Sequence, residues 1–490
     1  MTRSLLPVFA LLPSAAAAVL IVVSRRHPRV RDFWSVSAAA AQSAIFLAMT
    51  PHVLAGNSPA WSGIQLTAGV SLTLRADPLG VLFGTVASVL WLVTTVYSIG
   101  YTRALNEHAQ TRYFASFAWS LFATVGVALA GNLLTFLCFF ELLTLATFPL
   151  VIHRESPDAM RAGRVYLAYT LSGGAALLAA AVLVHVAVPN AEFRPGGFLA
   201  PQLSGSPLLW PILILGIAGC GVKAAIVPLH SWLPVAMIAP IPVSALLHAV
   251  AVVKAGVFGI ARVAGFVFGF PLLASLGADR MLAGVAVLTI LFASLTALRQ
   301  QNLKRLLAFS TISHLSYVIL GVALGTRETV TGALFHLASH AFLKITLFFT
   351  VGALYVGAHA ETIASVAGLG RRMPFVVVTF GIAGLLLAGL PPGMALVSKW
   401  TLVAGAAGCD AWIAALTLGL SGILNAAYFV PVVLSAYNSG AAEERLARVP
   451  VTMNVAFATS LAIACAAGIV PDLGFQLWSL SSLAAESLTR

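Results

Sequence analysis

Three ionisable side chains recur at intervals of four residues in the segment His336-Leu-Ala-Ser-His340-Ala-Phe-Leu-Lys344. Residues at i, i+4 and i+8 lie on one face of an α-helix, and at 1.5 Å per residue they cover about 12 Å. Imidazole titrates nearest to neutral pH, and a buried lysine gives up its proton far more readily than an arginine. The spacing therefore predicts a row of groups that pass protons along one helix, with His314 as a candidate extension.

The same two histidines have the spacing of a metal site. The metalloprotease motif, however, places glutamate directly after the first histidine, and this chain has Leu337 there. No cysteine or carboxylate stands nearby in the sequence to complete a tetrahedral ligand set. The pattern thus favours proton transfer, and no metal is expected at these residues.

Further charges interrupt other apolar stretches. They are Glu141 within Phe139-Phe-Glu-Leu-Leu-Thr144, Lys223, His248, Lys254 and Lys399. On insertion scales a charge in the centre of a bilayer costs about 2.5–3.5 kcal/mol, so such residues usually mark an ion pathway. Two alternatives remain open: Glu141 is a neutral acid that pins two helices, or the Lys254 ammonium reaches the membrane surface.

Two of the apolar stretches contain helix breakers beside a lysine. Pro228, His230 and Pro234 follow Lys223, and Pro391 and Pro392 precede Lys399. Proline removes a backbone donor, and irregular backbone at membrane depth survives only where protein or water surrounds it. One broken helix in each half of a chain is typical of inverted-repeat transporters. Ordinary proline kinks are the alternative interpretation.

Composition requires a membrane around these residues. Of the 490 residues, 60% are hydrophobic and 9% are charged, and the mean hydropathy is +0.98. A soluble domain has about 25% charged residues. We therefore predict an all-α polytopic membrane protein with about 14 transmembrane helices of about 20 residues each. The predicted ranges are 4–23, 33–55, 78–100, 112–130, 132–152, 163–188, 207–235, 241–262, 276–299, 303–324, 329–357, 373–408, 411–437 and 451–470.

The predicted organisation is an N-terminal three-helix segment, two inverted five-helix repeats with one broken helix each, and a C-terminal span and tail. Their boundaries are 1–110, 111–265, 266–440 and 441–490. The net charge of +12 does not indicate nucleic acid, because 16 of the 27 Lys and Arg lie in alternate loops against six in the other loops and termini. This positive-inside pattern predicts a multi-pass protein of the inner (cytoplasmic) membrane with both termini on the outer, periplasmic side.

Several segments between about residues 110 and 430 together match a known pattern. They are Phe140-Glu-Leu-Leu-Thr144, Pro228-Leu-His-Ser-Trp-Leu-Pro234, Pro242-Val-Ser-Ala-Leu-Leu-His248, Val253-Lys-Ala-Gly256, Leu303 to Ser313, His336 to Phe348, Ser398-Lys-Trp400 and Leu424-Asn-Ala-Ala-Tyr428. In these segments the chain resembles the antiporter-like proton-translocating subunits shared by respiratory complex I, Mrp-type sodium/proton antiporters and membrane-bound hydrogenases.

The resemblance implies an ion pair between Glu141 and Lys223 that controls the protonation of the lysine. It also implies proton transfer through Lys223, His248, Lys254, His336, His340 and Lys344 to Lys399. The chain departs from the family where Val235 and Asn302 replace common aspartates and His314 replaces a common glutamine. It also lacks a long lateral helix after its last predicted span, which favours the shorter complex I subunits or the D-type subunits of Mrp antiporters.

The predicted function is proton or cation translocation within a multi-subunit antiporter or redox-driven pump, with other membrane subunits, protons and Na⁺ as partners. An alternative is a proton-coupled partner in inorganic carbon uptake. An intramembrane hydrolase and a structural anchor are less favoured. The sequence has no nucleotide loop, flavin fingerprint or iron–sulfur pattern, so no cofactor and no independent catalysis are expected.

Overall fold

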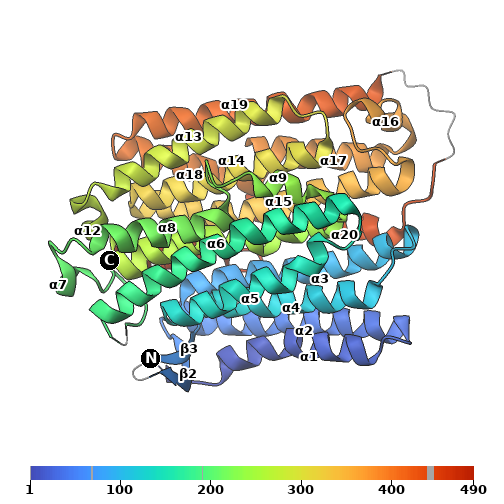
Figure 1. Ribbon diagram of the computed structural model, residues 1–490. Helices are drawn as coiled ribbons and strands as arrows, with labels where there is room; N and C mark the ends of the chain where they lie inside the picture. Colours follow the sequence, from blue (N-terminus) through green and yellow to red (C-terminus); the bar gives the residue numbers. More distant parts are fainter. Residues whose placement is uncertain (1, 68–69, 190, 439–445) are drawn as a thin grey trace.

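A computed structural model describes residues 2–67, 70–189, 191–438 and 446–490 of the chain (Figure 1). The helices of its first half are α1 (Leu6–Val23), α2 (Pro28–Leu54), α3 (Pro78–Ala104), α4 (Gln110–Ala128), α5 (Leu133–Val151), α6 (Pro157–Ala187), α7 (Ala200–Leu203), α8 (Leu209–Ala224), α9 (Trp232–Val235), the short η1 (Ala236–Ile238), α10 (Ile241–Ala245), η2 (Leu246–Val250), α11 (Val252–Arg262) and η3 (Val263–Phe268).

The remaining helices are α12 (Phe270–Ser275), α13 (Ala278–Leu298), α14 (Leu303–Leu324), α15 (Arg327–Ala358), η4 (Ala364–Val366), α16 (Leu369–Arg372), α17 (Pro374–Ala388), α18 (Met394–Gly408), α19 (Trp412–Tyr437), α20 (Val451–Ile469) and α21 (Leu477–Thr489). Polar caps start several of these apolar helices. The side chains that accept a backbone N–H of the first turn are Asp77, Asn132, Ser156, Asn302 and Thr326.

The prediction of an all-α polytopic membrane protein is confirmed. Eleven described helices are long and apolar enough to cross a membrane, and three shorter apolar helices, α8, α17 and α18, accompany them. Helix α4 lies in a predicted range but is not among these fourteen. The centre of the bundle consists of three buried helices: the eighth predicted span, α14 and α15. In α1, α13 and α20, by contrast, about two thirds of the most apolar stretch is not buried. The outer helices therefore present apolar surface to lipid or to other chains.

Both predicted broken helices are present. Helix α8 ends at Ala224, Ala225 adopts a left-handed conformation (φ 57°), and the chain runs through Pro228 before α9 begins. Helix α17 ends at Ala388, and Gly389 (φ 117°) turns the chain toward α18. The repeats proposed at 111–265 and 266–440 contain one break each.

The helix predicted at 241–262 is longer and less regular than expected. It continues through η3 to Phe268, and two of its parts, η2 and η3, are π-helical. A π-helical turn holds an extra residue, widens the helix and is frequent at functional sites. His248 lies in η2.

Two elements were not predicted. The strands β1 (Thr2–Arg3), β2 (Pro59–Thr67) and β3 (Val70–Arg75) form a small sheet, with β1 parallel and β3 antiparallel to β2. The segment after 470, expected to be a tail, contains α21, which packs against α15 and α3. Both elements are too short or too mixed in polarity to give a membrane-span pattern.

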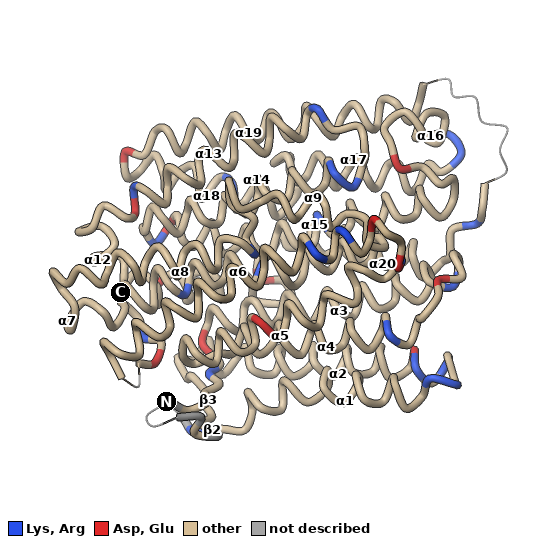
Figure 2. The backbone as a smooth tube through the Cα atoms, in the orientation of Figure 1, with Lys and Arg blue, Asp and Glu red and all other residues tan. Residues whose placement is uncertain are grey.

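The two chain ends lie at the same end of the bundle (Figure 1). Lys and Arg gather in the turn between α1 and α2, at the opposite end (Figure 2). This arrangement agrees with an even number of crossings. The side of the membrane on which the ends lie remains a prediction from the loop charges.

Candidate proton-transfer site

The Lys223 ammonium lies in the last turn of α8, directly before the first break, and is fully buried. It is 3.4 Å from the Glu141 Oε1 atom on α5, and it donates to the Phe140 carbonyl oxygen. It also lies 3.5 Å from the centre of the Phe140 ring. The partial negative charge at a helix C-terminus adds to this stabilisation of the cation. The pair implied by the resemblance is therefore formed.

Glycine allows two close approaches around this pair. A Cβ atom on Gly174 of α6 would lie 2.4 Å from the Glu141 carboxyl carbon. A Cβ atom on Gly256 of α11 would lie 2.1 Å from the backbone nitrogen of Ala224. Because both positions lack a side chain, α6 reaches the carboxylate and α11 packs directly against the end of α8.

Lys254, on α11, connects this region to α15. Its fully buried ammonium donates to the backbone carbonyl oxygen of Leu337, next to His336. His248, six residues earlier, packs at 5.1 Å from the Phe348 ring, and neither of its ring nitrogens has a hydrogen-bond partner. Among the described residues, His248 thus contacts no other member of the predicted row through a hydrogen bond.

The histidines of α14 and α15 form a hydrogen-bonded network. His314 Nδ1 lies 3.0 Å from His336 Nε2, and His336 Nδ1 lies 2.8 Å from the Ser398 hydroxyl on α18. His314 Nε2 lies 3.1 Å from the Asn425 Oδ1 atom on α19. Four helices therefore meet in one hydrogen-bonded chain of groups.

His340 and Lys344 continue along α15. The His340 ring lies 5.5 Å from that of His314 and 6.4 Å from that of His336, and both of its nitrogens lack a partner. The Lys344 ammonium donates to the Ser310 hydroxyl. His336, His340 and Lys344 thus lie together on one buried helix, as the i, i+4, i+8 spacing requires.

Lys399 follows the second break on α18. Its ammonium donates to the Ala388 carbonyl oxygen, at 2.9 Å, and Ala388 is the last residue of α17. The lysines beside the two breaks thus both meet a helix C-terminus. Lys399 and Trp400 also line a cavity of about 470 Å³ between α17, α18 and α19. This cavity gives Lys399 access to the molecular surface.

The broken-helix prolines do not line the row. Pro228, Pro391 and Pro392 are exposed, and His230 packs beside the rings of Phe292 and Phe309. Their part in the site is to interrupt the helices. Ser398, Asn425 and Ser310 were not identified from sequence as site residues, although all three lie in the matched segments. Neutral polar side chains are frequent in membrane helices, so their types alone do not distinguish them.

A second buried charge pair was also missed. Arg262 on α11 donates to both carboxylate oxygens of Asp77, one at 2.9 Å, and is surrounded by the rings of Phe193, Phe258 and Phe266. Asp77 at the same time caps α3 by accepting from Gly80 N. An arginine does not release its proton, so this pair holds α3 against α11.

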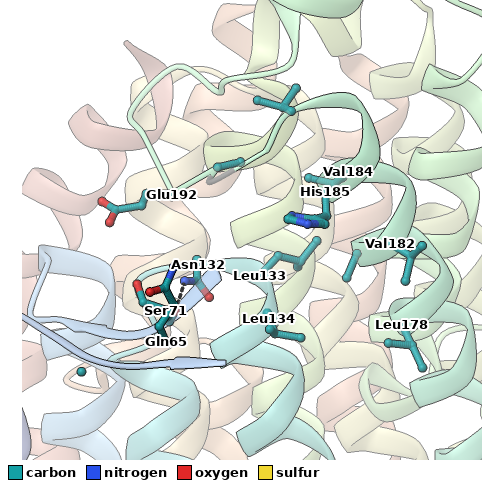
Figure 3. Close-up of a pocket in the computed structure, with 14 residues that line it drawn as sticks. Gln65, Ser71, Asn132, Leu133, Leu134, Leu178, Val182, Val184, His185 and Glu192 are labelled. Carbon is teal, nitrogen blue, oxygen red and sulfur yellow. Dashed lines mark hydrogen bonds between the residues drawn. The ribbon is translucent and has the colours of Figure 1, made fainter. Parts of the chain in front are cut away.

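A cavity of about 610 Å³ lies away from the row. Gln65, Ser71, Asn132, His185 and Glu192 give it a polar part, and Leu134, Leu178 and Val182 give it an apolar part (Figure 3). It is built from the β2–β3 hairpin, α5, α6 and the segment after α6. None of the predicted proton-transfer residues lines it.

The geometry agrees with a comparison to known families. The profile of the family "NADH:quinone oxidoreductase/Mrp antiporter, TM" matches residues 130–424, which include both breaks and the whole row. The chain belongs to this family. It is a cation/proton antiporter-like, multi-pass membrane subunit of the complex I and Mrp type.

The curated relatives include subunits of NADH-quinone oxidoreductases and subunits of antiporters. The N subunit of NADH-quinone oxidoreductase from Desulforudis audaxviator is 30% identical over 437 residues, which cover 87% of this chain and 84% of that protein. The M subunit from Rhodobacter capsulatus is 30% identical over 450 residues, covering 87% and 85%. The A/B subunit of a probable K⁺/H⁺ antiporter from Rhizobium meliloti is 30% identical over 81% of this chain, but the match spans only 39% of that longer protein.

Solved structures of family assemblies share the fold. A chain of the Mrp complex from a Dietzia species aligns with a TM-score of 0.88 at 22% identity, covering 99% of this chain and 97% of that chain. A chain of the archaeal membrane-bound sulfane sulfur reductase aligns with the same TM-score at 23% identity, covering 99% and 98%. The family profile and the curated relatives confirm the resemblance to the antiporter-like subunits, and these structures show that the fold is shared.

Proposed function

We propose that this chain moves protons across the membrane as one subunit of a multi-subunit cation/proton antiporter or redox-driven proton pump. The observation that carries the proposal is the Glu141–Lys223 pair, in which a fully buried ammonium faces a partly exposed carboxylate beside a broken helix. Separation of these two charges changes the stability of the protonated lysine, so the pair can act as a switch.

The path leads from Lys223 past the α8–α11 contact to Lys254, and from there to α15. His336, His340 and Lys344 continue it along that helix, His314 extends it to α14, and the Ser398 contact leads to Lys399. The gaps between consecutive groups require water molecules or side-chain motion. We place His248 in the path as a group that water must reach.

Relatives of this chain are named as subunits of oxidoreductases and antiporters. We therefore propose that other membrane subunits are its partners and that they supply the energy, from a redox reaction or from a cation gradient such as Na⁺. The comparisons do not favour a role in inorganic carbon uptake. A hydrolase is not favoured either, because Ser398, the hydroxyl bonded to His336, is fully buried.

The chain has five lysines, of which four belong to the proposed path, and the fifth, Lys304, provides a control. Lys223→Ala removes the charge, and Lys223→Arg keeps it but cannot release a proton. Both variants should abolish proton translocation in membrane vesicles that contain the complete complex, while the chain still inserts. Lys304→Arg is the matched control and should transport normally. Normal pumping by Lys223→Arg would reduce Lys223 to a fixed charge and refute the proposed path.

A further inference from the structure

Three metal-ligand side chains converge outside the membrane-spanning helices. Glu107 and His108 lie in the turn between α3 and α4, and His153 lies in the turn between α5 and α6. One ligand atom from each residue lies within 4.8 Å of the others. The His153 Nε2 atom is 3.7 Å from Glu107 Oε2, and the His108 and His153 rings stack with 4.7 Å between their centres.

His153 lacks the partners that a buried imidazole normally has. Its side chain is fully buried, yet neither ring nitrogen makes a hydrogen bond. An unpaired buried polar atom destabilises the folded chain, and a bound ligand would offset this cost. His153 is therefore a buried ligand without a partner that faces Glu107 and stacks on His108.

The charges around the cluster leave room for a cation. Arg112 is engaged by Glu155 and by the His153 carbonyl oxygen, and Arg154 is the other nearby positive group. Burial raises the pKa of the Glu107 carboxyl, and the Arg154 charge opposes this. Glu107 is half-buried and His108 is exposed, so an ion from the aqueous side can reach the cluster.

We infer that Glu107, His108 and His153 form a binding site for one divalent transition-metal ion of the Zn²⁺ class. Two imidazoles and one carboxylate make a known zinc ligand set, with a fourth position left for water. In a tetrahedral site with bonds of about 2.1 Å, neighbouring ligand atoms lie about 3.4 Å apart, so the present cluster needs only a small contraction. Such an ion would fasten the α3–α4 turn to the α5–α6 turn. The inference does not depend on the proposed proton path.

The site is tested by isothermal titration of Zn²⁺ into the full-length chain, purified in detergent with an affinity tag that contains no histidine. We expect about one equivalent of Zn²⁺ to bind, and we expect Mg²⁺, which prefers oxygen ligands, not to compete. His108→Ala removes an exposed ligand without opening a cavity and should weaken Zn²⁺ binding at least about tenfold. Glu107→Gln keeps the side-chain shape and should weaken it as well. His359→Ala, an exposed histidine at the end of α15, is the matched control and should bind like the wild type.

Failure of the wild type to bind Zn²⁺ would overturn the inference. So would His108→Ala and Glu107→Gln variants that bind Zn²⁺ with unchanged affinity. Unfolding temperatures measured without metal should agree among the variants, because His108 is exposed and Glu107→Gln is nearly isosteric. Zinc-edge X-ray absorption of the wild type should show two imidazole ligands. The His108→Ala variant should show one imidazole ligand fewer, which distinguishes this site from any other zinc site on the chain.

Discussion

Glu141 and Lys223 differ in their surroundings, and that difference makes their contact adjustable. The lysine is fully enclosed, whereas the Glu141 side chain is 26% exposed, so the carboxylate can leave the ammonium at a smaller cost in solvation than the reverse. The ammonium then keeps only the Phe140 carbonyl, the Phe140 ring and the end of α8. A change of about 1.4 kcal/mol in that balance alters the ratio of protonated to neutral lysine tenfold.

Removal of the carboxylate charge should slow transport without abolishing it. In Glu141→Gln the loss of a partly exposed pair of about 1 kcal/mol corresponds to a rate lower by about fivefold. Proton translocation by vesicles that contain the complete complex measures the effect, and Glu328→Gln, an exposed carboxylate on α15, is the control. Wild-type rates at every pH would show that Glu141 only joins two helices.

The site residues that could be predicted from sequence are those whose types are rare in apolar segments. Lys223, Lys254 and Lys344 stand out in the sequence because charges in apolar segments are costly, and all three are buried in the structure. Ser398 and Asn425 join the histidine network equally directly, but their presence in a span costs little. His248 shows the opposite case. Its residue type predicted a relay group, but in the π-helical turn where it lies neither ring nitrogen has a hydrogen-bond partner.

At the scale of helices, the positions of the two breaks could be predicted from sequence, whereas the contacts between distant helices could not. Proline and glycine act through their own backbone, so the positions of the α8–α9 and α17–α18 breaks follow from local sequence. The extra residue in η2, the sheet and α21 depend on packing against distant helices, which local patterns do not contain. Arg262 and Asp77 are 185 residues apart, and no spacing rule connects them.

The Arg262–Asp77 pair should be a strong determinant of stability. Asp77→Asn would leave the enclosed guanidinium without its counter-charge and lower the free energy of unfolding by about 3–5 kcal/mol. Thermal unfolding of the detergent-solubilised chain measures this, with Asp158→Asn at the exposed start of α6 as the control. A double variant, Asp77→Asn with Arg262→Gln, should recover part of the loss. An unfolding temperature equal to that of the wild type would show that Arg262 is satisfied by water.

At the scale of the whole molecule, the chain divides into a buried centre and apolar outer helices. The α19 residues Ile413, Leu416 and Ile423 are each about 70% exposed. Lipid can cover them, but so can the helices of a neighbouring protein of the complex, and the cavity beside Lys399 opens next to this same helix. Lys399, the last lysine of the proposed path, therefore lies close to a surface where another chain could extend that path.

The isolated chain should show little ion-coupled proton flux. A chain that opened its proton path without partners would dissipate the gradient, so the state of its charge pairs must depend on them. Reconstitution of the purified chain in liposomes with a pH-sensitive dye, with and without Na⁺, measures this flux. Flux should return when the cognate membrane subunits are added. Robust Na⁺-coupled flux from the chain alone would make it a self-sufficient antiporter.

The missing side chain at Gly174 has a consequence for how the charge pair can be studied. The atom that a new Cβ would meet is the end of the Glu141 side chain, which can move aside at little cost in stability. Gly174→Ala is thus a change of volume alone, which displaces the Glu141 carboxylate while the chain keeps all of its ionisable groups. Transport should slow about as much as in Glu141→Gln, and hardly further when both changes are combined. Gly284→Ala on α13, where a Cβ meets nothing within 4 Å, should leave the rate unchanged. One methyl group would then separate the contribution of distance from that of charge.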